Sequence, residues 1–161
     1  MKLCEELSPL DEELVRRELN DFVPAELFDI HAHLVLATDD LPLHLLGRQL
    51  GFNEYAAALD RWLPSRKISS LLFGFPCRDN DRNAINTWLA AEIRDHRSGG
   101  SNRGLLLVAP ADDREQVTNL VQNGNFVGLK PYHCYAPLAD TNQAKIEQFA
   151  PEWMWETCHD T

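Results

Sequence analysis

The feature that most constrains the fold is an alternation of short apolar runs with amphipathic helical segments. Four such runs, each rich in residues that favour strands and followed by turn residues, occupy positions 28–34, 68–75, 105–109 and 126–130. Between them, apolar residues recur at helical spacing, as at Ile85, Leu89 and Ile93. Near-continuous apolar strands separated by helices are typical of a parallel sheet covered by helices. The sequence therefore predicts an α/β fold.

Two α/β architectures begin in the same way, the doubly wound open sheet and the (β/α)8 TIM barrel. Nucleotide-binding open sheets carry a glycine-rich loop, in which backbone N–H groups contact phosphate, after their first strand. Gly74 and Gly128 are isolated, and neither opens a GxGxxG or GxxxxGK[ST] motif. This weakens the nucleotide-binding version of the open sheet.

The residues before the first run predict a helical leader over residues 1–25, followed by one α/β unit over residues 26–161. Ser8 is a suitable N-cap, and Pro24 ends the helix. A further helical region is expected near the end of the chain, with Pro151 interrupting it. The apolar stripe of the leader, expected to pack against the rest of the domain, is formed by Leu10, Leu14, Leu19 and Phe22.

Two further histidines receive ordinary structural interpretations. His44 lies in a stretch expected to form a loop and then a short buried helix, and it is interpreted as a surface or packing residue. His96 lies near the end of the helix that contains Ile93, where a partly protonated imidazole suits the helix dipole.

Composition excludes several classes of protein. The chain has 161 residues, 44% of them hydrophobic, and a formal net charge of -10. The negative charge argues against nucleic acid or an anionic membrane as partner. No apolar run approaches the roughly 18 residues needed to cross a bilayer, and the first residues lack the apolar segment of a signal peptide. A cytoplasmic protein acting on a small molecule is expected.

The cysteines are scattered and form no CxxC pair. They are Cys4, Cys77, Cys134 and Cys158. Without a secretory signal, reduced thiols are the default. No base is arranged beside Cys134 or Cys158 in the sequence, so both are expected to be unreactive.

The first strand carries the clearest chemical signal. In an extended strand Asp29, His31 and His33 share one face, while the apolar residues between and around them share the other. Two histidines two residues apart can direct their rings at one cation, with N–metal distances of roughly 2.0–2.1 Å for zinc. The alternative is that both histidines only share the solvated face of an edge strand. Two imidazoles behind a carboxylate favour a metal site, although an open zinc site needs about three protein ligands.

Asp29-Ile30-His31-Ala32-His33 at the end of a first strand resembles the amidohydrolase superfamily of metal-dependent (β/α)8 barrels, and more narrowly its amidohydrolase-2 (amidohydrolase-related) family. Three other stretches resemble the same family. They are Gly74-Phe75-Pro76, Val127-Gly128-Leu129-Lys130-Pro131-Tyr132-His133 and Phe149-Ala150-Pro151-Glu152-Trp153-Met154-Trp155-Glu156.

The resemblance implies roles for individual residues. His31 and His33 match the family's first pair of metal ligands, with zinc as the expected ion, and Asp29 is a carboxylate that orients them. Lys130 lies at the carboxyl end of a strand, where barrel active sites are built. It is expected to contact substrate or, when carboxylated as in binuclear relatives, to bridge two metals. His133 is a further candidate for substrate binding or for ligation.

The chain also departs from the family's pattern. The family's further histidines on the fifth and sixth strands, and its catalytic aspartate on the eighth, have no counterpart here, so no catalytic residue is identified in this chain. A complete barrel of this kind has about 250 residues, and the chain is expected to supply the first four βα units. Such a piece leaves two sheet edges unpaired, which predicts self-association or pairing with a missing carboxyl-terminal half.

Three hypotheses remain open at this point. In the first, the chain is the amino-terminal portion of a metal-dependent hydrolase, or of a related decarboxylase or lyase, that acts on a small organic substrate. In the second, it is a catalytically inactive, truncated remnant or a metal-binding fragment. In the third, it is a complete four-stranded open sheet with an unrelated small-ligand site at the strand ends.

Overall fold

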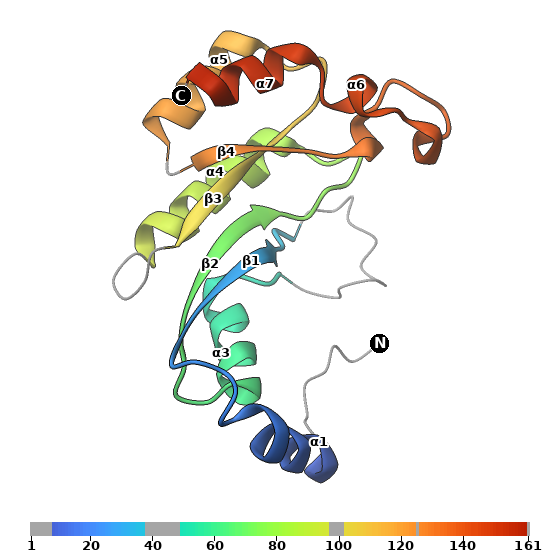
Figure 1. The fold of residues 1–161 in the computed structure, drawn as a ribbon. Coiled ribbons are helices and arrows are strands. Elements are labelled where there is room, and N and C mark those ends of the chain that lie inside the picture. Colours follow the sequence, from blue (N-terminus) through green and yellow to red (C-terminus); the bar gives the residue numbers. More distant parts are fainter. Residues whose placement is uncertain (1–7, 38–48, 97–101, 125, 161) are drawn as a thin grey trace.

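The structure, a computed structural model, describes residues 8–37, 49–96, 102–124 and 126–160. It confirms the predicted alternation, because a four-stranded, all-parallel sheet has the order β1-β2-β3-β4 with helices between the strands (Figure 1). The helix expected around His44 lies outside the described residues. The strands are β1 (Glu26–Leu34), β2 (Lys67–Gly74), β3 (Arg103–Val108) and β4 (Phe126–Pro131).

Two of the longer helices begin where the sequence supplies a side-chain cap. The carboxylates of Asp81 and Asp113 accept hydrogen bonds from the N–H groups of Ala84 and Gln116. None of the helices that the structure describes has the length and apolar character needed to span a bilayer. The helices that follow the strands are α3 (Phe52–Trp62), α4 (Arg82–Asp95), α5 (Arg114–Asn123) and α7 (Glu152–Asp160).

The region after β4 is divided into short pieces. It contains two 3-10 turns, η2 (His133–Tyr135) and η3 (Thr141–Gln143), and one short helix, α6 (Ile146–Phe149). Pro151 separates α6 from α7, which confirms the expected interruption.

The leader is helical, as predicted, but its apolar stripe does not pack as expected. It comprises α1 (Pro9–Leu14) and a π-helical turn, η1 (Val15–Leu19), and it starts with reciprocal hydrogen bonds between Ser8 and Asp11. Arg66 ties the leader to the domain by donating to the backbone carbonyl of Asn20 at 2.7 Å. The prediction of a buried stripe is wrong, since all four of its residues are exposed: Leu10, Leu14, Leu19 and Phe22.

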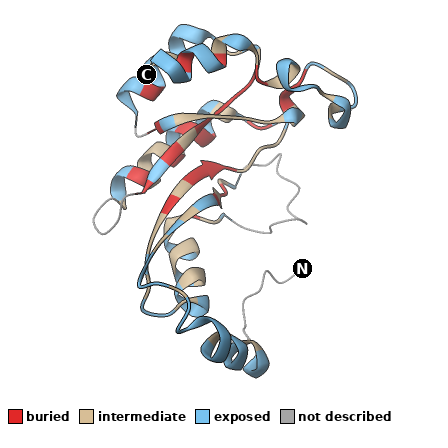
Figure 2. Ribbon diagram, in the orientation of Figure 1, coloured by how far each residue is buried: buried red, intermediate tan, exposed pale blue. Residues whose placement is uncertain are grey.

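The core lies on one side of the sheet. Buried residues of all four strands and of α4, α5 and α7 form one apolar cluster, and Tyr55 of α3 packs against it. Figure 2 shows that the buried segments concentrate on β2, β3 and α4, whereas the leader is exposed. The cluster includes Leu34, Leu72, Leu89, Ile93, Leu106, Val108, Val117, Val121 and Met154.

A bulge in β1 changes which of its side chains share a face. Asp29 lies opposite Ser70 and Ala32 lies opposite Leu72, so Ile30 and His31 together face a single residue of β2. The strict alternation predicted from the sequence is therefore wrong across the bulge. Asp29 lies on the side of α3, while His31 and His33 lie against the ring of Phe73.

Candidate metal centre

His31 and His33 lie together near the carboxyl end of β1. Their ring centroids are 5.2 Å apart, and the ring planes meet at 63°. Both rings stand edge-on to Phe73 of β2, with centroid distances of 4.8 Å and 4.6 Å. His31 is exposed and His33 is half-buried. The structure thus brings together the two imidazoles that the sequence singled out.

The hydrogen bonds of His33 fix which of its ring nitrogens carries the hydrogen. Nδ1 lies 3.2 Å from the backbone carbonyl of Gly74 at the end of β2. Because a carbonyl can only accept, Nδ1 donates and the neutral ring keeps a lone pair on Nε2. Nε2 is 3.3 Å from the hydroxyl of Tyr132, which donates to it. An Nδ1 that donates to a backbone carbonyl and an Nε2 without hydrogen is the arrangement that metal-binding histidines commonly show. Here the Nε2 lone pair accepts from Tyr132, so an ion would displace that hydroxyl.

The surroundings of His33 favour its neutral form. Burial lowers the pKa of His33, and the nearby positive charges of His31 and Lys130 lower it further, although the hydrogen bond to Gly74 opposes them. Tyr132 stays protonated, because burial, followed by the charge on Cys134, raises its pKa to about 12. A neutral imidazole is the form that ligates metal.

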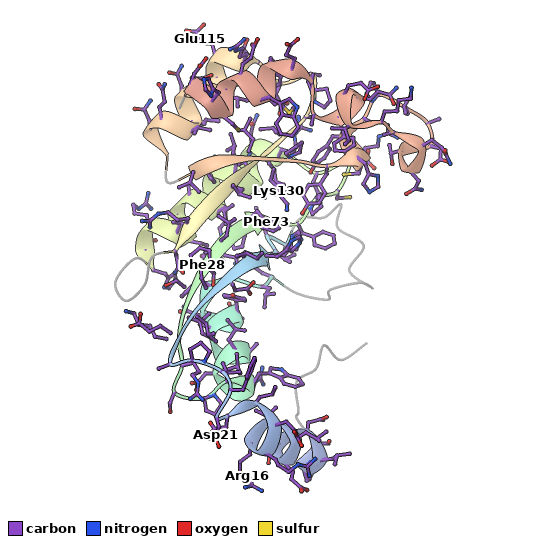
Figure 3. All side chains as sticks on the ribbon, in the orientation of Figure 1. Arg16, Asp21, Phe28, Phe73, Glu115 and Lys130 are labelled. Atoms are coloured by element: carbon purple, nitrogen blue, oxygen red, sulfur yellow. The ribbon has the colours of Figure 1, made fainter. Side chains whose placement is uncertain are left out.

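Lys130 points into the same group of side chains from β4. Its Nζ lies 4.2 Å from the ring centroid of Phe73 and 5.4 Å from that of Tyr132. Figure 3 shows Lys130 and Phe73 next to one another. Burial lowers the pKa of the Lys130 amine, and none of the ion pairs among the described residues involves it. The group is therefore cationic and aromatic.

Asp29 does not lie beside the imidazole rings. One of its carboxylate oxygens accepts the backbone N–H of His31 at 2.9 Å, and the other accepts the hydroxyl of Tyr55 at 2.8 Å. The Tyr55 oxygen also lies 2.8 Å from the Ser70 hydroxyl. Asp29 thus holds the backbone of the bulge and anchors α3, and its influence on His31 passes through the main chain.

His133 points elsewhere. Its Nδ1 lies 3.1 Å from the backbone carbonyl of Thr141, and the residue is exposed. The side chain that contacts His33 from this part of the chain is that of Tyr132, which sequence reasoning did not assign to the site. The backbone of Tyr132 is extended, so the alternation of β4 continues and places Tyr132 on the same face as Lys130. Period-two spacing from Lys130 is the signal that could have identified it.

The donor set fits part of a metal site. His31 and His33 supply two imidazoles, and the His33 ring is oriented by Gly74 with its Nε2 lone pair accepting from Tyr132. Among the described residues, no group of three or more His, Cys, Asp or Glu side chains is placed to hold a metal ion. The groove of about 370 Å³ between the leader and the end of α3, lined by Val15, Leu19 and Trp62 among others, lies apart from these histidines.

Comparison of the chain with protein-family profiles, with curated proteins and with solved structures gives no match. The resemblance to the amidohydrolase superfamily therefore stays a prediction from the sequence.

Proposed function

We propose that the chain is the amino-terminal portion of a metal-dependent, amidohydrolase-type barrel in which His31 and His33 are metal ligands. The observation that carries this proposal is the orientation of His33. Its Nδ1 is engaged by Gly74, and its Nε2 is directed toward the group that contains Tyr132. A histidine that only shared a solvated strand face would not need both nitrogens placed in this way.

The topology of the sheet supports a barrel rather than a doubly wound sheet. In doubly wound folds the strand order reverses at a switch point, whereas consecutive strands of a barrel are neighbours throughout. The observed order is β1-β2-β3-β4 without reversal. The helices α4, α5 and α7 contribute to one core cluster and so cover one face, leaving the histidines on the other.

In this proposal each described side chain has a task. A divalent ion, most simply zinc, would supply a lowered pKa for bound water and would polarise a substrate carbonyl. His31 and His33 would hold it, and Asp29 would fix the main chain of His31. Lys130 would attract an electron-rich oxygen of a small organic substrate, while Tyr132 would donate to a neighbouring acceptor. The same arrangement serves hydrolysis or a related decarboxylation.

Apart from Lys130, the described residues offer no further ligand and no general base for this proposal. A carboxylated Lys130 would add one ligand. The resemblance implies that further histidines and an aspartate belong to the other half of the barrel. The second candidate function is that of a catalytically inactive metal-binding fragment. It is favoured because the described residues contain no group of three or more His, Cys, Asp or Glu side chains around the site, and two imidazoles alone hold an ion only weakly.

Metal content per chain tests the proposal. The bound zinc would be measured by equilibrium dialysis against excess zinc, for the chain and for the double variant His31→Ala/His33→Ala. The matched control is His159→Ala, because His159 is exposed on α7. We expect zinc near one equivalent in the chain and in the control, and loss of zinc in the double variant.

Equal metal content in all three proteins would contradict the proposal. Where zinc binds as expected, hydrolysis of a panel of small esters, amides and carboxylated aromatics separates the two candidates. Turnover that is lost with zinc supports the hydrolase, and zinc binding without turnover supports the metal-binding fragment.

A further inference from the structure

Two cysteines, Cys77 and Cys134, lie in turns that follow β2 and β4, the strands that carry Phe73 and Lys130. Cys77 follows β2, and its carbonyl accepts the N–H of Asn80 at 3.3 Å, which closes a turn. Cys134 lies within η2, directly after β4. Both are half-buried and carry free thiols. Since β2 and β4 run parallel in one sheet, both turns lie at its carboxyl edge.

Contacts on either side of the cysteines hold these two turns against one another. Arg78, the residue after Cys77, donates to the backbone carbonyl of Ala136 at 2.9 Å and also to that of Leu138. The guanidinium of Arg82 lies over the ring of Tyr135, 4.9 Å from its centroid. Ala136 is two residues after Cys134, and Tyr135 is the next residue. Both cysteines therefore belong to one packed contact between the turns.

The surroundings of Cys134 include Cys77 and the two arginines that hold the turns together. Burial raises the pKa of the Cys134 thiol, and the charge on Cys77 raises it further, while Arg78 and Arg82 act in the opposite direction. Cys158, by contrast, is exposed on α7.

We propose that Cys77 and Cys134 form a reversible disulfide that ties the turn after β2 to the turn after β4. The oxidant is a small-molecule disulfide such as oxidised glutathione. One thiolate attacks it and releases one glutathione thiol, and the second thiolate then attacks the mixed disulfide and releases the other. The two cysteine thiols lose two protons and two electrons, and the oxidant becomes two glutathione molecules.

The disulfide would fix two segments that contact His33. The ring of Phe75, two residues before Cys77, lies 5.5 Å from the His33 ring, and Tyr132, two residues before Cys134, donates to His33 Nε2. Oxidation would therefore change how freely the candidate metal centre adapts to a ligand. This last consequence rests on the proposed function, whereas the disulfide itself does not.

Peptide mapping of the full chain tests the disulfide. The folded protein would be incubated with oxidised glutathione, its remaining thiols alkylated, and the product cleaved with trypsin without reduction. We expect loss of two of the four thiols and a mass decrease of two hydrogen atoms. We also expect fragment 68–78 to be joined to fragment 115–145, and reduction to separate them. Four persisting thiols, or a bond that involves Cys4 or Cys158, would overturn the proposal.

Two variants sharpen the result. Cys158→Ser should give the same joined fragments as the unchanged chain. Cys77→Ser should leave Cys134 unbridged and able only to carry glutathione. If Cys77→Ser formed another intramolecular disulfide in the same yield, the pairing would be wrong.

A zinc titration of the reduced and oxidised proteins separates this inference from the proposed function. A roughly tenfold difference in zinc Kd, of the size that outer contacts of metal ligands produce, would support control of the site. Equal zinc affinities with the disulfide formed would overturn only the link to the site. No zinc binding in either state would overturn the proposed function and leave the disulfide standing.

Discussion

The two edges of the sheet differ sharply in how they are packed. The edge formed by β3 and β4 is called the β3 side here, and the edge formed by β1 is called the β1 side. On the side of β3 and β4, helix α4 buries Ile85, Leu89 and Ile93, and α5 buries Val117 and Val121. On the side of β1, the leader and α3 contain no buried residue, and the apolar side chains of Phe28 and Ile30 are 47% and 72% exposed. The helices of both sides are amphipathic in sequence.

The difference shows that amphipathic spacing predicts which face of a helix is apolar. It does not predict whether another element packs over that face. The β3 side is a two-layer core held mainly by apolar contacts. The β1 side is held mainly by polar contacts, such as Tyr55 with Asp29 and Arg66 with Asn20. The two histidines of the candidate metal centre come from the less packed β1 side, while Lys130 and Tyr132 reach them from the end of β4. The predictions below test this division.

The largest expected effect is a cavity in the β3 side. Leu89→Ala removes a side chain with 0% exposure and should lower the free energy of unfolding by about 2–5 kcal/mol. The matched change on the other side is Leu14→Ala, in which the side chain is 39% exposed; it should cost less than about 0.5 kcal/mol. Urea denaturation measures both. Equal losses would remove the distinction between the two sides.

The second effect concerns the polar anchor within the β3 side. The Asn86 amide donates to the Leu107 carbonyl at 2.9 Å and accepts the Leu107 N–H at 3.0 Å, in buried surroundings. Asn86→Ala should leave both backbone groups unpaired and lower stability by about 1–3 kcal/mol. Asn123→Ala is the control, because the amide of Asn123 donates to an exposed helix carbonyl, that of Asn119, at 3.0 Å. A stability change as small as the control's would show that water replaces the amide.

A third, smaller effect tests the polar anchor of the β1 side. Tyr55→Phe keeps the ring and removes the hydroxyl that contacts Asp29 and Ser70. We expect a loss of about 1 kcal/mol, together with faster hydrogen exchange of the His31 amide, because Asp29 is less firmly held. Tyr135→Phe serves as a comparison, since no side chain within the described ranges forms a hydrogen bond of ordinary geometry with the hydroxyl of Tyr135. Unchanged exchange at His31 would separate Asp29 from the site.

The smallest effect is the pH dependence that His33 contributes in the metal-free chain. Its pKa is lowered from the usual 6.5, with burial as the largest cause. The unfolded chain then binds more protons than the folded one, so this contribution to stability is present above 6.5 and is lost as the pH falls. His33→Gln should flatten the stability profile over about pH 5 to 7. A profile as steep as that of the unchanged chain would assign the dependence to other groups.

Local patterns in the sequence are sufficient to predict the helices, the strands and their parallel arrangement. The caps at Asp81 and Asp113 and the break at Pro151 are visible as residue types at fixed offsets. The exposure of the leader's apolar stripe could not be predicted from the sequence. Burial depends on whether another element packs over the helix, and the residues of the helix alone do not show this.

The site was predictable only in part, for reasons of backbone geometry. His31 and His33 follow from their spacing, but the bulge at Ile30 and His31 reverses the face of Asp29. The pairing of Asp29 with Tyr55 joins residues 26 positions apart, so no local pattern shows it. Tyr132 follows from alternation after Lys130, whereas the turn at His133 directs that ring toward Thr141.

The most direct test of the central claim is nitrogen NMR of the histidine rings before and after zinc is added. We predict that the free protein has His33 with hydrogen on Nδ1 and a lone pair on Nε2, and that one equivalent of zinc shifts the resonances of His31 and the Nε2 resonance of His33 together. A His33 ring with hydrogen on Nε2, or zinc-induced shifts confined to other histidines, would contradict the account.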